Sequence, residues 1–210
     1  MPVNPTPSPT RRADAERNRD KILAAARSAF ADADSEVSMA EISRRAGIGM
    51  ATLYRNFPNR RELLEALYTG EVDAICAAAG RIEGETPGAA LTAWLHLFFA
   101  FAVSKHHIAP DLLAHSDGAN PVFGESRARA LAAGRPLLVA AQVTREVRGN
   151  LTLEQILDMI VAIAQIRGGD TYLEPILHSA LAGLRPPSDA RAPRAGATGR
   201  PAIAPNRAAR

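Results

Sequence analysis

The sequence has only one cysteine, Cys76, among its 210 residues. A single thiol excludes a disulfide within the chain, which suits a reducing, cytoplasmic compartment. Cys76 lies in an alanine-rich stretch that is typical of a helix. We interpret it as a small core residue, with a redox-sensing thiol as the alternative.

A secretion signal and a clear membrane span are also missing. The first ten residues, MPVNPTPSPT, are rich in proline and have no apolar core, which a signal peptide needs. The run from Thr86 to Ser104 has no formal charge and is long enough to cross a membrane. Because it contains Pro87, Gly88 and His96, we interpret it as a core helix and expect no membrane partner.

No stretch alternates β-branched and polar residues over the length of a strand. Proline and glycine gather at the two ends of the chain and at a few positions between long stretches rich in alanine, leucine, arginine and glutamate. A hydrophobic content of 47% excludes wholesale disorder, and the length suffices for one large or two small domains. The sequence therefore predicts an all-α fold.

Signals of catalysis are few. The sequence shows no Ser-His-acid set, no paired-carboxylate motif, no phosphate-binding glycine loop and no metal quartet. His106, His107, Asp111 and His115 are closely spaced, but Pro110 interrupts the helix that would place three of them on one face. We interpret this group as a solvated loop and expect neither metal nor cofactor. A small helical enzyme acting on a hydrophobic molecule is the weaker alternative for the function.

The stretch from Ser38 to Tyr54 predicts two short helices joined by a tight turn. Ser38 and Glu41 have the spacing of a capping box, in which the hydroxyl accepts from the first turn and the glutamate reaches back. Gly47 supplies the positive φ that ends the first helix, and Met50 begins the second. Four apolar residues form a shared seam: Ile42, Ala46, Ile48 and Leu53. Such a pair of helices is a helix-turn-helix, with a plain helical hairpin as the alternative.

The outward face of the second helix has the composition that a DNA groove requires. Small residues let a helix start approach base edges, hydroxyls reach phosphates, and arginine or asparagine pairs with bases. We predict phosphate contacts from Thr52 and Tyr54, with Ser38 and Arg60 on either side. The predicted DNA-binding residues are Ser38, Gly49, Met50, Ala51, Thr52, Tyr54, Arg55, Asn56 and Arg60.

Positive charge is arranged around this region although the net charge of the chain is only +3. The middle of the chain is mildly acidic, and the excess of arginine lies towards the two ends. Arginines precede and follow the helix-turn-helix at positions 11, 12, 17, 19, 55, 60 and 61. This local arrangement favours a nucleic-acid partner more strongly than the bulk charge does.

The run from Arg17 to Leu67 closely resembles the DNA-binding region of TetR/AcrR-family transcriptional regulators. It contains RDKILAAARSAF and SMAEISRRAGIGMATLYRNFPNRRELLEALY, and its most specific pieces are AGIG, TLYRNF and a basic residue before ELL. Gly49 stands where the family usually has a serine or threonine cap, and the loop from Asp32 to Val37 lacks the usual glycine. The later pieces LTLEQILDMIVAIAQIRG and YLEPIL are similar to an actinobacterial-type subgroup of that family.

The resemblance implies a homodimeric repressor with a helix-turn-helix domain and a larger effector-binding domain. Its partners would be a near-palindromic operator in double-stranded DNA and a small-molecule effector, whose identity the sequence leaves open. We expect a disordered arm over 1–10, the DNA-binding domain over 11–58, the effector-binding and dimerisation domain over 59–185, and a disordered tail over 186–210. The helix after Asn59 would transmit effector binding to the DNA-reading heads.

Aromatic residues mark a candidate effector pocket. Trp94, Phe98 and Phe101 follow one another at helical spacing, and four of the ten aromatic side chains of the chain lie in this helix. The resemblance places an effector cavity in this domain, and we predict that these three residues and Phe123 line it, with plain core packing as the alternative. A mostly uncharged aromatic pocket suits a hydrophobic or amphipathic molecule.

The last two predicted helices are apolar on nearly every side, so a second subunit is expected to cover one of their faces. The same four-helix dimer interface is what the resemblance implies. Its predicted residues are Ile156, Ile160, Ile163, Tyr172, Ile176 and Ala180.

Overall fold

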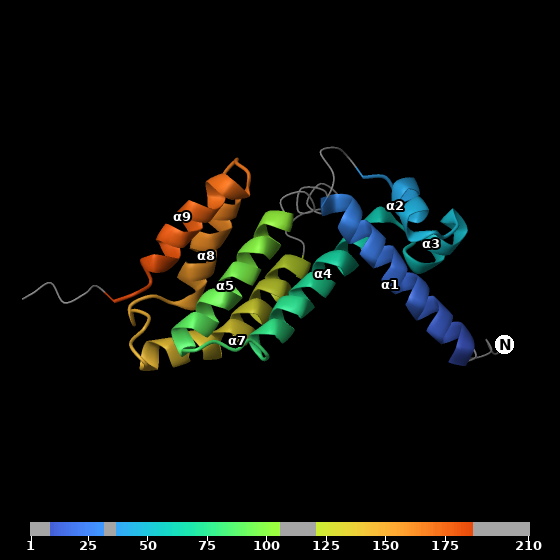
Figure 1. The fold of residues 1–210 in the computed structure, drawn as a ribbon. Helices are drawn as coiled ribbons and strands as arrows, with labels where there is room; N and C mark the ends of the chain where they lie inside the picture. The colour runs from blue at the N-terminus through green and yellow to red at the C-terminus, as the bar shows by residue number, and fades with distance from the viewer. Residues whose placement is uncertain (1–8, 32–36, 106–120, 187–210) are drawn as a thin grey trace, which may run out of the picture.

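The computed structural model describes residues 9–31, 37–105 and 121–186, and within these ranges the regular structure is entirely helical (Figure 1). The helices are α1 (Pro9–Ala31), α2 (Met39–Ala46), α3 (Met50–Asn56), α4 (Arg60–Ala79), α5 (Pro87–Ser104), α7 (Pro121–Val143), α8 (Leu153–Ala164) and α9 (Asp170–Ala182). The predicted all-α class is confirmed.

Helices α1, α2 and α3 form one end of the molecule, where α1 packs against both short helices (Figure 1). A hydrophobic cluster, here called the first core, joins them to the beginning of α4. Its buried residues are Ile22, Ala25, Ala26, Ala29, Phe30, Val37, Ile42, Leu53, Phe57, Leu63, Leu64 and Leu67. The apolar seam predicted for the helix-turn-helix is therefore part of a larger core that α1 and α4 complete.

Helix α4 connects the two ends of the chain's fold (Figure 1). Leu63, Leu64 and Leu67 in its first half belong to the first core, whereas Ile75 and Ala79 in its second half belong to a second cluster. The change between cores thus falls within α4, several residues after the boundary expected between positions 58 and 59. One continuous helix is thus shared by both cores.

The second core lies among α5, α7, α8 and α9 and the last turns of α4. Trp94 of α5 is fully buried in it and donates its indole N–H to the carbonyl of Ile75, 3.1 Å away. A methyl group at Gly134 of α7 would overlap the Trp94 ring, so the glycine lets α7 approach α5 closely. This close packing places α4, α5, α7 and α8 around the cavity described below.

Several helix boundaries follow from capping residues. Asn59, Thr86 and Thr152 each accept a backbone N–H bond at the start of α4, α5 and α8, and Thr152 forms the expected box with Gln155. These predicted helix starts are confirmed. Helix α7 runs unbroken through Pro136, and both the proline and Ala132, whose carbonyl loses the bond that the proline cannot donate, are exposed.

Helix α1 begins at Pro9, which is earlier than the expected start near Arg12. The rest of the expected arm, the group His106, His107, Asp111 and His115, and the tail after residue 186 lie outside the described residues.

Helix α5 is long and apolar enough to cross a membrane by length and composition alone. In the structure it packs against α4, α7 and α8 and contributes five buried residues to the second core. This environment agrees with the interpretation of the run as a core helix.

Candidate nucleic-acid interface and internal cavity

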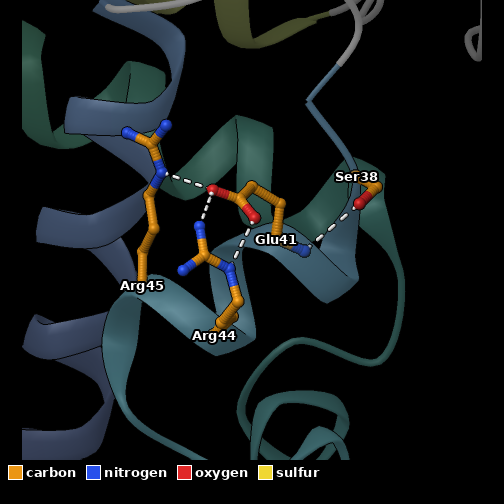
Figure 2. A network of polar contacts seen from close by, with 4 residues as sticks. All are labelled: Ser38, Glu41, Arg44 and Arg45. Atoms are coloured by element: carbon orange, nitrogen blue, oxygen red, sulfur yellow. Dashed lines mark hydrogen bonds and ion pairs between the residues drawn. The ribbon is translucent and has the colours of Figure 1, made fainter.

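The start of α2 combines a serine cap with a charged network (Figure 2). The Ser38 hydroxyl accepts from the backbone N–H of Glu41 at 3.2 Å, as predicted. The Glu41 carboxylate does not close the box; it accepts from Arg44 at 2.7 and 2.9 Å and from Arg45 at 2.7 Å. The two arginines offer stronger, charge-assisted bonds than a backbone N–H, and this explains the difference from the expected box.

The network fixes two guanidinium groups of the last turn of α2 around the carboxylate of its first turn, so these three side chains together carry a net positive charge. Hydrogen bonds from Arg44 and then Arg45 lower the pKa of Glu41 from 4.5 to about 2. Glu41 is therefore ionised throughout the physiological range, and it orders Arg44 and Arg45 on the surface of the helix-turn-helix.

The turn between α2 and α3 is held by backbone geometry and by one buried hydroxyl. Gly47 has φ +65°, a conformation that a side chain disfavours, and its N–H bonds to the carbonyl of Arg44. The buried Ser43 hydroxyl donates to the carbonyl of Ile48 at 2.7 Å. Leu53 and Phe57 then anchor α3 in the first core, which fixes the direction of the opposite face of α3.

That opposite face is open to solvent at most of the predicted DNA-binding positions. Gly49 and Ala51 are exposed at the start of α3, and Met50 and Tyr54 are 37% and 46% exposed. Thr52 is half-buried. The exposed surface is thus small near the helix start and carries a phenol hydroxyl one turn later, a shape that fits a major groove.

Arg55 and Asn56 bond back onto their own helix. The Arg55 guanidinium donates to the Ala51 carbonyl at 3.1 Å and to the Thr52 hydroxyl at 3.0 Å. The half-buried Asn56 donates its amide to the Thr52 carbonyl at 2.8 Å. Arg55 is exposed and held by these two bonds to its own helix, whereas the amide of the half-buried Asn56 bonds the last turn of α3.

Arg60 has a structural role that spacing did not indicate. Arg60 donates to the carbonyl of Val37 and lies over the ring of Phe30, with 5.6 Å between the guanidinium carbon and the ring centre. It therefore joins the starts of α2 and α4 to α1. A phosphate contact from Arg60 would be made by a side chain that this packing has already oriented.

Arg19 of α1 is a candidate that sequence reasoning did not place in the site. Its guanidinium lies 4.4 Å from the centre of the Phe57 ring and donates to the carbonyl of Asn56 at 3.5 Å. Both partners lie more than thirty residues along the chain, so no local spacing reveals the contact. The contact places a positive charge at the C-terminal end of α3.

A partly open cavity of about 430 Å³ lies among α4, α5, α7 and α8. Of the four predicted effector residues, Phe98, Phe101 and Phe123 line it, whereas Trp94 is fully buried in the second core and does not. The lining residues are Tyr68, Val72, Ile75, Phe98, Phe101, Ala102, Lys105, Phe123, Ser126, Arg127, Ala130, Leu157, Val161 and Gln165. Its walls are mainly aromatic and aliphatic, and its volume lies in the range of about 300–1,000 Å³ that small-molecule sites occupy.

Aromatic contacts run from this cavity to the first core. The Tyr68 ring contacts Phe101 and Phe123 with centroid distances of 5.6 and 5.1 Å, and Phe101 contacts Phe98 at 5.9 Å. Tyr68 and Phe123 also pack against the first core. Two cavity walls are therefore shared with the domain that carries the helix-turn-helix.

Lys105, at the end of α5, is a buried cation that sequence reasoning missed. Its side chain is 7% exposed, it pairs with Glu71 of α4, and its ammonium lies 5.9 and 5.5 Å from the ring centres of Tyr68 and Phe101. Burial lowers the pKa of Lys105, and the bond to Glu71 opposes this shift. Glu71 in turn lies 3.8 Å from Arg27 of α1. A lone lysine after an apolar helix gives no sequence signal for this arrangement.

Cys76 of α4 is half-buried, and burial raises the pKa of its thiol. A raised pKa lowers the thiolate fraction on which oxidation depends. The structure thus favours the packing interpretation of Cys76 over the redox one.

The predicted dimer residues fall into two groups. Ile156, Ile160 and Ile163 of α8 are 1%, 0% and 7% exposed within the single subunit, because α5 and α7 already cover them. Their side chains belong to the second core and not to a surface. Tyr172, in contrast, is 60% exposed, and Ile176 and Ala180 on the same helix are half-buried.

A helix-turn-helix with an exposed face, joined by one helix to a second helical domain, is typical of the class of helix-turn-helix DNA-binding proteins. Comparison with known families gives the particular family. Residues 22–67 match the bacterial regulatory proteins of the tetR family, and residues 86–186 match the C-terminal domain of SbtR-like transcriptional regulators. The chain belongs to the TetR family of DNA-binding transcriptional regulators.

Solved structures support the same assignment. A TetR transcriptional regulator from Streptomyces coelicolor is 34% identical over 81% of this chain and 99% of its own, with a TM-score of 0.67. A TetR transcription regulatory protein from Mycobacterium vanbaalenii is 30% identical over 83% of this chain and 98% of its own, with a TM-score of 0.66. A tetR-family regulatory protein from Rhodococcus shares the fold at 13% identity and a TM-score of 0.57, covering 81% of this chain and 98% of its own. Among curated proteins, no sequence matches at a significant level.

Proposed function

We propose that this regulator is a homodimeric repressor that binds a near-palindromic operator and leaves it when a small molecule enters the cavity. The observation that carries this proposal is the sharing of Tyr68 and Phe123 between the cavity and the first core. A ligand that displaces either ring acts directly on residues packed against the DNA-binding domain. The protein thus works by binding and release in the cytoplasm, without a catalytic step.

On the DNA side, α3 enters the major groove with its exposed N-terminal half. Met50 and Ala51 lie against base edges, Tyr54 donates to a phosphate, and Arg55 exchanges its bonds within α3 for a base. Thr52 and Ser38 contribute hydroxyls, and Gly49 allows the close approach. Arg60 and Asn56 act mainly by holding the ends of α2, α3 and α4.

On the dimer side, α9 supplies the interface. Tyr172, Ile176 and Ala180 recur every four residues and so share one face of the helix. In a two-fold dimer this face meets its own copy, and burial of Tyr172 in particular removes a large exposed ring from water. Substitution of Tyr172 by glutamate is expected to give a monomer in sedimentation velocity while the helix content is retained.

The test of the proposed function is selection of bound sequences from a random duplex library with the full chain at two salt concentrations. An inverted repeat recovered at both concentrations supports a dimeric, sequence-specific regulator. The matched control is Leu97→Ala, which removes an exposed side chain of α5 remote from α3 and should recover the same repeat. Binding that is blind to sequence and lost at the higher salt concentration contradicts the proposal.

A further inference from the structure

The cavity has an uneven charge. Among the described residues that line it, two are cations, Lys105 and Arg127, and none is a carboxylate. The remaining polar groups that line it are the Tyr68 and Ser126 hydroxyls and the Gln165 amide. The cavity thus offers positive charge and hydrogen-bond donors within walls that are otherwise apolar.

The acidic partners of both cations lie outside that lining. Glu71, which pairs with Lys105, borders a neighbouring hollow together with Arg27. Asp158, which pairs with Arg127 at 2.8 Å, has a largely exposed side chain. Lys105 lines both this cavity and the neighbouring hollow, and its ammonium, which has almost no exposed surface, pairs with Glu71; a ligand carboxylate in the cavity would draw the ammonium away from Glu71.

We propose that the cavity binds a small, largely apolar acid whose carboxylate pairs with Lys105 and whose body lies among the aromatic rings. This inference rests on the proposed function, because it names the chemical class of the effector. A carboxylate inside an apolar cavity is stable only when it is paired, and a lysine ammonium forms a charge-assisted bond to it. The aromatic walls from Tyr68, Phe98 and Phe123 bury the apolar body.

The same charges disfavour other ligands of equal size. A neutral alcohol buries the same apolar surface but does not pair with Lys105, and an amine is repelled by Lys105 and Arg127. The geometry therefore predicts the affinity order acid, alcohol, amine for ligands that share one apolar body.

Glu71 competes with the ligand carboxylate for Lys105, so substitutions of these two residues should have opposite effects. Replacement of Lys105 by methionine keeps an unbranched side chain and removes the charge, so the preference for acids is lost. Glu71→Gln removes the competitor and leaves the ammonium to the ligand, so acids bind more tightly. The two variants break the same ion pair and have opposite effects on acid affinity, an outcome that general loosening of the fold does not produce.

The experiment is isothermal titration calorimetry of the full chain, without DNA, with two sets of probes. One set is decanoate, 1-decanol and decylamine; the other is 2-naphthoate, 2-naphthylmethanol and 2-naphthylmethylamine. At least one of the two acids is expected to bind tenfold or more tightly than its alcohol. Lys105→Met should make the acid and the alcohol bind equally well. Arg127→Gln should reduce the ratio of acid affinity to alcohol affinity, and Glu71→Gln should raise it several-fold.

Arg129→Gln is the matched control, because Arg129 pairs with Asp73 and does not line the cavity. It should leave the ratio unchanged, and the melting temperature of each variant reports whether it is folded. If Lys105→Met does not fold, the other two variants provide the test: the ratio of acid affinity to alcohol affinity should fall in Arg127→Gln and rise in Glu71→Gln. Equal binding of acid and alcohol, stronger binding of the alcohol or amine, or no binding of either acid overturns the proposal.

Failure here and failure of the proposed function are distinguishable. Calorimetry without DNA does not depend on an operator, and selection of bound sequences does not depend on a ligand. Recovery of an inverted repeat without acid binding supports the proposed regulator and contradicts this class of effector. Acid binding that depends on Lys105, together with DNA binding that does not depend on sequence, supports the proposed ligand site and contradicts the proposed regulator.

Discussion

The ring of Tyr68 meets the ring of Phe123 nearly edge-on, with 5.1 Å between centroids and 85° between planes. Tyr68 belongs to α4 and Phe123 to the first turn of α7, and both pack against the first core while lining the cavity. Such an edge-to-face pair contributes about 0.5–1.5 kcal/mol beyond its buried area and holds the two helices in one arrangement. A ligand that separates the rings would therefore change the position of α4, the helix shared by the two cores, relative to α7.

Phe123→Leu is expected to weaken the coupling between ligand and DNA. The aliphatic side chain still fills part of the cavity wall but lacks the edge-to-face contact, so the ligand no longer selects one position of α4. Allosteric coupling usually lies between 5-fold and 150-fold, and we expect the variant to lose about tenfold of it. The measurement is operator affinity by fluorescence anisotropy with and without a bound acid. Val139→Ala, at an exposed position of α7, is the control, and equal coupling in Phe123→Leu and the parent refutes the role of this pair.

Two substitutions in α3 separate phosphate contacts from base contacts. Tyr54→Phe removes one hydroxyl and should weaken binding to all duplexes by about tenfold, the effect of one charge-assisted hydrogen bond. Arg55→Ala should relax the preference at one base pair of each half-site and change affinity for unrelated duplexes little. Repeating the library selection with each variant checks both outcomes. A loss of preference in Tyr54→Phe, with none in Arg55→Ala, shows that the assigned roles are reversed.

Helix α7 offers a matched pair of glycines for a test of close packing. A Cβ at Gly134 would overlap the Trp94 ring, whereas a Cβ at Gly124 meets nothing within 4 Å. Gly134→Ala should therefore lower the free energy of unfolding by about 1–3 kcal/mol. Gly124→Ala should raise it by about 0.5–1 kcal/mol, because alanine loses less backbone freedom in a helix. Urea denaturation followed by Trp94 fluorescence measures both, and similar effects of the two substitutions contradict the packing.

The Glu41 network makes a prediction about pH. Folding lowers the pKa of Glu41 from 4.5 to about 2, so the unfolded chain binds more protons between these values. The stabilisation from Glu41 is complete above about pH 5 and is lost as the pH falls to about 2. Glu41→Gln should therefore be less stable than the parent near neutral pH, with a difference that shrinks across this window. Hydrogen exchange of the α2 amides measures it, and a constant difference shows that Glu41 does not titrate as described.

The helices were predictable where capping residues and periodicity act locally. Ser38, Asn59, Thr86 and Thr152 each cap the helix that was expected to follow them. The position of Gly47 likewise gave the turn between α2 and α3. The outline of the helix-turn-helix follows from these signals because each depends on residues only three or four positions apart.

Contacts between distant segments were not predictable. Trp94 was expected at the cavity, but its indole bond to Ile75 and its contact with Gly134 place it in the second core. Periodicity could not separate the two apolar sides of α8, because it does not show that α5 and α7 cover Ile160. Lys105 carries no local signal, since its partner Glu71 lies on another helix.

The central claim is tested most directly by comparing two duplexes, the inverted repeat recovered by selection and a scrambled sequence of the same composition. Fluorescence anisotropy at two salt concentrations gives the dissociation constant of each with the full chain. We expect the repeat to bind at least about a thousandfold more tightly, with two chains on each duplex and a preference that survives at the higher salt concentration. Equal affinity for the two duplexes at both salt concentrations would contradict a sequence-specific regulator.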